Sequence, residues 1–215
     1  MSVYMTEKEQ LDIIKKWWQR HSNTVTLIAS IILLLVAGLK YWYWHQQKST
    51  QQASNTYEQM MVAFSNKDNK STRAYANQLL KEHNNSIYAD AARLTLAKLF
   101  IEHAKFSDAQ TQLRYVAEHS STSAIQQIAK LRIARLLIAE KSYEKALEQL
   151  DVVNPAYDSL INEIKGDIYA ATGLYQQAIA SYRTAIEQAQ SKGITNIFLE
   201  MKTSDMAALT SAEKS

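Results

Sequence analysis

An uncharged, apolar run over residues 22–39 constrains the fold of this chain more than any other feature. It reads SNTVTLIASIILLLVAGL, lies between Arg20 and Lys40, and is followed by the aromatic cluster YWYW. About eighteen helical residues at ~1.5 Å each span about 27 Å, close to the ~30 Å hydrocarbon core of a bilayer. Because Tyr and Trp are enriched at membrane interfaces, we expect a transmembrane helix with an aromatic belt over residues 22–44.

Two alternatives for this run are a buried core helix and a cleaved signal peptide. A core helix usually carries a polar face, whereas this run has no charged residue. A signal peptide has an apolar core of about 7–15 residues and a small-residue cleavage site, but here bulky aromatic residues follow the run. We therefore predict an uncleaved signal anchor.

The basic residues around the run predict its orientation. More of them precede it than follow it: Lys8, Lys15, Lys16 and Arg20 against Lys40 and Lys48. Because the more basic flank stays in the cytoplasm, residues 1–21 are expected to form a cytoplasmic tail. In this tail Leu11, Ile14 and Trp18 recur at helical spacing. They suit a helix on an anionic leaflet, an extension of the span, or a site for a membrane partner.

The composition after the run predicts an all-α domain. The chain has 4 Gly and 1 Pro, and Ala, Leu, Gln, Lys and Glu are abundant. It has no Cys, which excludes a disulfide framework and thiolate zinc sites. Basic and acidic residues nearly balance after residue 45, so the domain lacks the basic footprint of a nucleic-acid-binding protein. A protein partner is the expectation.

A repeated spacing of small and large residues becomes visible after residue 87. Its steps of 3, 6, 3, 4 and 3 residues occur three times: at Ala97, Phe100, Phe106, Ala109, Leu113 and Val116, at Ala134, Leu137, Tyr143, Ala146, Leu150 and Val153, and at Gly166, Tyr169, Tyr175, Ala178, Tyr182 and Ala185. A small residue lets two helices approach closely, and the larger residues fill the adjoining grooves. Offsets of 37 and 32 residues between copies indicate a solenoid of paired helices.

This spacing resembles the tetratricopeptide repeat, most clearly in GDIYAATGLYQQAIASYRTAI from Gly166 onward. The first two copies have Ala in place of that Gly. The resemblance implies an α-solenoid of paired antiparallel helices over residues 57–210, after a helical stalk or linker at 45–56. The expected repeats lie at about 87–120, 124–153 and 157–190, with a capping helix at about 194–209. A degenerate pair of helices at 57–64 and 72–81 is expected to precede them, and Asn154-Pro155 is expected to break a helix.

No residue pattern of an enzyme is present in the sequence. Gly occurs only at 38, 166, 173 and 193, which leaves no glycine-rich phosphate loop, and the five His show no HExxH spacing. Glu144 and Glu148 are one helical turn apart, but beside Lys141 and Lys145 they indicate a solvated face rather than an acid–base pair. We predict a non-enzyme without metal, cofactor or small-molecule substrate.

The predicted working surface is the concave face formed by the first helix of each pair. Its helical phase nominates nine residues: Leu94, Lys98, Ile101, Leu131, Arg135, Ile138, Leu160, Glu163 and Asp167. A mixture of aliphatic and charged groups suits a peptide or a partner helix. The alternative is that many of the aliphatic residues pack against the neighbouring repeat.

The order of features along the whole chain is similar to the YfgM family, ancillary subunits of the SecYEG translocon. It comprises Trp17-Trp18 in the tail, a span that ends in Lys40-Tyr41-Trp42, His45-Gln46, the repeats, and LEMK at 199–202. The resemblance implies a bacterial inner-membrane protein with a periplasmic domain. Its partners would be SecYEG and a PpiD-type chaperone, and its clients newly exported proteins. The alternative is a scaffold that sequesters a regulator of envelope stress signalling.

Overall fold

The computed structural model describes residues 7–212, except the side chains of residues 7–10, 13, 14, 25 and 29. Two compact units divide the chain, Met1–Gln52 and Ala53–Ser215, and each is described by itself. The described residues form α-helices joined by short turns and one 3₁₀ helix, with no strand among them. The prediction of an all-α fold is confirmed.

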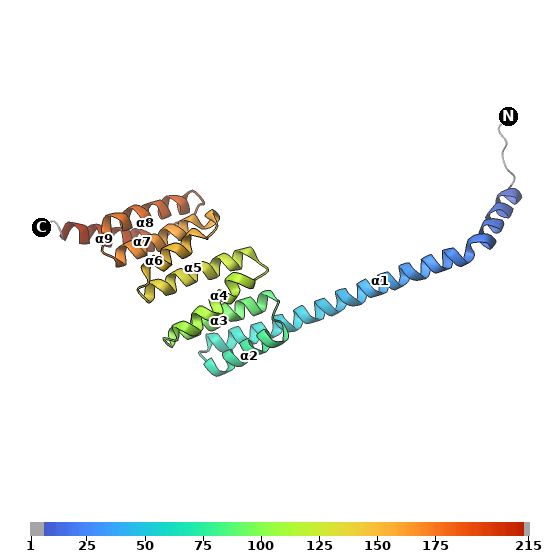
Figure 1. Cartoon of the computed structure of the whole chain (residues 1–215), viewed down its shortest axis with the longest axis horizontal. Helices are drawn as coiled ribbons and strands as arrows, with labels where there is room; N and C mark the ends of the chain where they lie inside the picture. Colours follow the sequence, from blue (N-terminus) through green and yellow to red (C-terminus); the bar gives the residue numbers. More distant parts are fainter. Residues whose placement is uncertain (1–6, 213–215) are drawn as a thin grey trace, which may run out of the picture. The chain divides into compact units, whose positions relative to one another are not determined.

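The first unit is helical throughout its described part. Helix α1 runs from Glu7 to Ser65, so its last turns belong to the second unit (Figure 1). Its apolar side chains are exposed; Leu34 is 73% and Tyr43 70% exposed. One segment among the described residues, within Thr26–Ser65, is long and apolar enough to cross a membrane. In the tail Leu11 and Trp18 are exposed, whereas the side chain of Ile14 lies outside the described residues.

In its described part, the second unit contains the end of α1 and eight further α-helices. They are α2 (Asn69–Glu82), α3 (Ile87–Glu102), α4 (Phe106–His119), α5 (Ser123–Ala139), α6 (Tyr143–Asp151), α7 (Asp158–Ala171), α8 (Tyr175–Gln190) and α9 (Ile197–Ala212). From α2 onward each helix packs on the next, and α5 also packs on α7 (Figure 1). The pairs α3–α4, α5–α6 and α7–α8 carry the three copies of the repeated spacing. The helix expected at 57–64 is the end of α1 rather than a separate element.

The turns within the pairs repeat as regularly as the helices do. One residue in each adopts a left-handed conformation, with φ between 55° and 77°: Lys67, Ala104, Lys141 and Gly173. The N–H of the following residue then donates to the carbonyl five residues earlier, at 2.8–2.9 Å. This bond closes the end of the first helix. Because Lys67 shares the geometry, the end of α1 and α2 form a further pair of the same kind.

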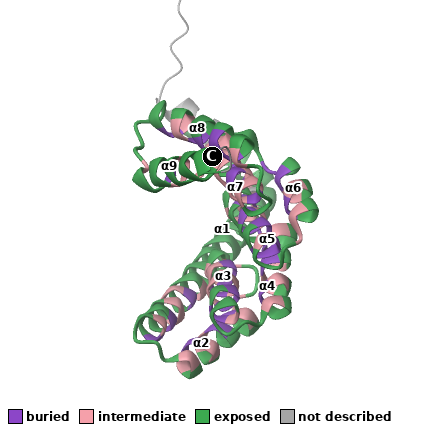
Figure 2. Ribbon diagram, turned by 90° about the vertical axis from the view of Figure 1, so that its left-hand side faces the viewer, coloured by how far each residue is buried: buried purple, intermediate pink, exposed green. Residues whose placement is uncertain are grey.

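The core lies where consecutive helices face each other, as the buried positions in Figure 2 show. Ala97, Ala109, Ala134 and Ala146 are at most 1% exposed and form one cluster with the leucines of the repeat. A second cluster joins α1, α2 and α3. The α-helical backbone is interrupted between α6 and α7, as Asn154-Pro155 predicts. There Pro155–Tyr157 form a 3₁₀ helix, and the Asn154 side chain accepts a hydrogen bond from the Ala156 N–H at 2.8 Å.

Candidate partner-binding groove between α3 and α5

An apolar cavity of about 270 Å³ opens between the first helices of two consecutive pairs, α3 and α5. Its apolar lining comes from three helices: Leu94, Ala97 and Ile101 of α3, Leu113 of α4, and Leu136 and Ala139 of α5. The space between the helices stays open at Ala97 because its side chain is small; a larger residue there would fill it. The cavity therefore offers a pocket for an apolar side chain of a partner.

Three cationic side chains complete this lining: Lys98, Arg132 and Arg135. The Lys98 ammonium lies 5.1 Å from the centre of the Phe64 ring. The Arg132 guanidinium donates to the Leu94 carbonyl at 3.4 Å. Burial, together with the neighbouring charge of Arg135, lowers the pKa of Arg132 from its usual value. The partners of Lys98 and Arg132, an aromatic ring and a backbone carbonyl, are therefore uncharged.

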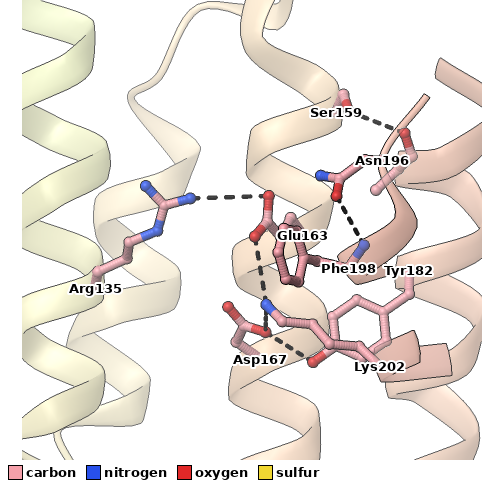
Figure 3. A network of polar contacts seen from close by, with 9 residues as sticks. Arg135, Ser159, Glu163, Asp167, Tyr182, Asn196, Phe198 and Lys202 are labelled. Atoms are coloured by element: carbon pink, nitrogen blue, oxygen red, sulfur yellow. Dashed lines mark hydrogen bonds and ion pairs between the residues drawn. The ribbon is translucent and has the colours of Figure 1, made fainter. Parts of the chain in front are cut away.

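The acidic residues of the next first helix, α7, are already paired (Figure 3). Lys202 of α9 bonds to Glu163 at 3.3 Å and to Asp167 at 2.7 Å. The Tyr182 hydroxyl donates to Asp167 at 2.8 Å. Burial and this hydrogen bond raise the pKa of Tyr182 far above its usual value, so its hydroxyl keeps its proton. Arg135 reaches Glu163 from the other side at 3.9 Å.

The structure separates the nine nominated residues into three groups. Leu94, Lys98, Ile101 and Arg135 line the cavity. Leu131 is 2% exposed and Ile138 packs against the core, so these two aliphatic side chains contact neighbouring helices instead. Leu160 and Glu163 line a separate hollow beside the turn from α8 to α9, and Asp167 belongs to the network with Lys202. Their binding role stays a prediction.

Two residues of this surface were missed by the sequence reasoning. Arg132 lies three residues before Arg135 on the same helix, so helical spacing could have found it. Lys202 lies 39 residues after Glu163, and no local pattern connects the two. Among the described residues no group of three His, Cys, Asp or Glu could hold a metal ion. The arrangement is suited to binding a polypeptide.

Comparison with known proteins agrees with the fold of repeated helix pairs. Residues 15–208 match the model of a family described as a tetratricopeptide repeat-like domain. A protein of Aggregatibacter actinomycetemcomitans, named ancillary SecYEG translocon subunit, is 30% identical over 190 residues, covering 88% of this chain and 93% of that protein. The chain belongs to the YfgM family.

Two further members of the YfgM family bear the same name. The protein of Neisseria gonorrhoeae is 27% identical over 94% of this chain and 98% of its own length. The protein of Escherichia coli K12 is 21% identical over 96% of this chain and 100% of its own length. No solved structure matches the chain. The similarity extends over the tail, the apolar run and the repeats together, so it concerns the whole arrangement.

Proposed function

We propose that this chain is a single-pass inner-membrane adaptor that acts beside the SecYEG translocon. The observation that carries the proposal is similarity over nearly the full length to proteins named ancillary SecYEG translocon subunit. It is supported by one helical segment that is long and apolar enough to cross a membrane, next to a tetratricopeptide-like unit. The chain holds partners rather than catalysing a reaction.

Tethering explains why such an adaptor needs no high intrinsic affinity. A domain fixed to the bilayer by residues 22–44 meets partners in the same membrane as if they were at high local concentration. Weak contacts made by the groove between α3 and α5 then suffice to hold a partner. The uneven basic flanks favour a cytoplasmic tail and a periplasmic domain. The family resemblance extends the proposal to a PpiD-type chaperone as a second partner and to newly exported proteins as clients.

Site-specific photo-crosslinking in living cells tests the proposal. A photoreactive residue replaces Leu34 in the span, which is 73% exposed, or Ile101 in the groove, which is 39% exposed. We expect covalent products with translocon subunits or with the chaperone from at least one of these positions. The control position is Glu118, exposed on the second helix of the first complete pair, where we expect no such product. If neither Leu34 nor Ile101 gave a product, the adaptor function would be wrong.

A further inference from the structure

The groove between α3 and α5 carries a surplus of positive charge. Lys98, Arg132 and Arg135 line it, and no carboxylate does. Within the described part of the chain neither Lys98 nor Arg132 forms an ion pair, and the pair of Arg135 with Glu163 is long, at 3.9 Å. A cluster of like charges at one site repels itself unless an anion is added. The lining of the groove thus carries a positive charge that its own residues do not balance.

The acidic side chains of the next first helix, α7, do not supply that anion. Glu163 and Asp167 of α7 both bond to Lys202, at 3.3 and 2.7 Å, and the Tyr182 hydroxyl also donates to Asp167. Figure 3 shows the Lys202 ammonium between the two carboxylates, with Arg135 on the opposite side of Glu163. The negative charge of α7 is therefore largely satisfied by α9. The positive charge on α3 and α5 remains available to a partner.

The position of Arg132 adds to this imbalance. Its guanidinium lies against the backbone of α3, where it donates to the neutral Leu94 carbonyl at a long 3.4 Å. No described carboxylate forms an ion pair with Arg132, and partial burial and the nearby charge of Arg135 both lower the pKa of Arg132. A carboxylate at the mouth of the groove would form charge-assisted hydrogen bonds with these groups.

We propose that the groove binds a polypeptide segment in which an aliphatic side chain is flanked by carboxylates. The aliphatic side chain would enter the apolar pocket, and the carboxylates would meet Lys98, Arg132 and Arg135. A cavity of about 270 Å³ is slightly smaller than the ~300–1,000 Å³ usual for small-molecule sites, which favours a side chain over a whole ligand or an acyl chain. The inference rests on the proposed adaptor function and names the chemistry of the client or partner.

Fluorescence anisotropy with the detergent-solubilised full chain tests the assignment. The probe is a fluorescein-labelled peptide of repeated Leu-Glu-Glu-Leu units, and its matched control has Gln in place of Glu. We expect the acidic peptide to bind about tenfold more tightly than its control, and to weaken as salt is added. Lys98→Glu should abolish that preference, and Ala139→Phe should block the pocket without changing charge. Lys145→Glu makes the same charge reversal at an exposed position of α6 and should leave binding unchanged.

Other outcomes would overturn the assignment. Equal binding of both peptides, or unchanged binding by Lys98→Glu in a chain that keeps its helical circular dichroism, would reject the electrostatic match. Binding of labelled oleate without binding of either peptide would identify the groove as a lipid site. Crosslinking from Leu34 to the translocon separates the two ideas. If crosslinking persists while the peptide does not bind, only this inference fails; if crosslinking is absent from both Leu34 and Ile101, the adaptor function fails as well.

Discussion

Gly166 and Tyr182 form a matched pair at the closest approach of α7 and α8. A Cβ atom added at Gly166 would collide with the ring of Tyr182, which is 2% exposed and fixed by its hydrogen bond to Asp167. In the two earlier repeats the same positions hold Ala97 with Leu113 and Ala134 with Leu150. The third repeat therefore pairs the larger side chain with the smallest residue, which conserves the combined volume.

The effect of Gly166→Ala on the free energy of unfolding should depend on which residue stands at position 182. Gly166→Ala alone should destabilise the protein by about 1 kcal/mol, because overpacking costs ~1–3 kcal/mol while alanine returns about 1 kcal/mol of helix propensity. In a Tyr182→Leu background the same substitution should instead stabilise by up to about 1 kcal/mol. Urea unfolding of the four variants, followed by circular dichroism, measures the effect. Equal effects in both backgrounds would contradict the steric explanation.

Asp68 is the N-cap residue of α2, and its capping hydrogen bond depends on pH. Its carboxylate accepts a hydrogen bond from the Ser71 N–H at 3.0 Å, and hydrogen bonding with the Ser71 side chain and with this N–H lowers the pKa of Asp68 below its usual value of 3.8. A carboxyl with a lowered pKa in the folded state stabilises above its usual pKa, and that contribution is lost as the pH falls through the folded value. The cap should therefore weaken below about pH 4.

Hydrogen exchange of the Ser71 amide measures this effect, after correction for the intrinsic pH dependence of exchange. We expect its protection to fall below about pH 4 in the natural chain. Asp68→Asn keeps a capping oxygen but cannot titrate, so its protection should stay constant over the same range. A fall of equal size in Asp68→Asn would show that the loss is not caused by this carboxyl.

At the scale of elements, α9 is held to the domain by few apolar contacts. Leu199 is the one buried side chain of this helix among the described residues, while Phe198 and Met201 are 71% and 57% exposed. Lys202 adds the two ion pairs with α7. Because so little apolar surface holds the helix, its attachment depends on Lys202 more than a helix in the middle of the solenoid would.

Removing this charge should loosen α9 selectively. Lys202→Met leaves Glu163 and Asp167 without their shared cation, and a partly exposed ion pair contributes about 0–1 kcal/mol. We expect amide exchange in α9 to accelerate about fivefold while exchange in α3 to α6 stays unchanged. Glu200→Gln, a charge change at an exposed position of the same helix, is the control. Unchanged exchange in Lys202→Met would show that Leu199 and its neighbours hold the helix without help.

The sequence predicts the helix pairs well because their packing repeats at short, regular spacings. Ala97 and Phe100, or Gly166 and Tyr169, lie within one turn of each other, so their pattern is visible without the fold. Contacts such as Lys202 with Glu163 depend on where a later helix docks, which no spacing determines. Helical phase also has limited angular precision, which explains why Leu131 and Ile138 were assigned to an open face although they contact the core.

The continuity of α1 shows a different limit of sequence reasoning. Residues 45–56 contain neither Gly nor Pro, and the structure has helix through them up to Ser65. The sequence allowed both a stalk and a linker there, because polar residues form helices that are stable only in a suitable context. The apolar stretch at 57–64 was predicted as a separate helix because its apolar residues, such as the buried Met60, follow a polar segment in the sequence.

At the scale of the whole molecule, the chain joins two units whose surfaces suit different surroundings. The first unit presents exposed aliphatic side chains such as Leu34, whereas the second unit buries its aliphatic residues between helices. Lipid is the solvent that the first arrangement requires, and water the solvent of the second. Under the proposed function, this tether keeps the tetratricopeptide-like unit at one bilayer and favours partners in the same membrane.

The orientation of the chain in the membrane gives the last prediction. The natural sequence has no Cys, so an added one is a unique label. Gln19 in the tail and Asn66 after the span are both exposed. Because the more basic flank stays in the cytoplasm, Asn66→Cys should react with a membrane-impermeant maleimide in intact spheroplasts. Gln19→Cys should react only after the membrane is permeabilised. The reverse pattern would place the tetratricopeptide-like unit in the cytoplasm and would remove newly exported proteins from its clients.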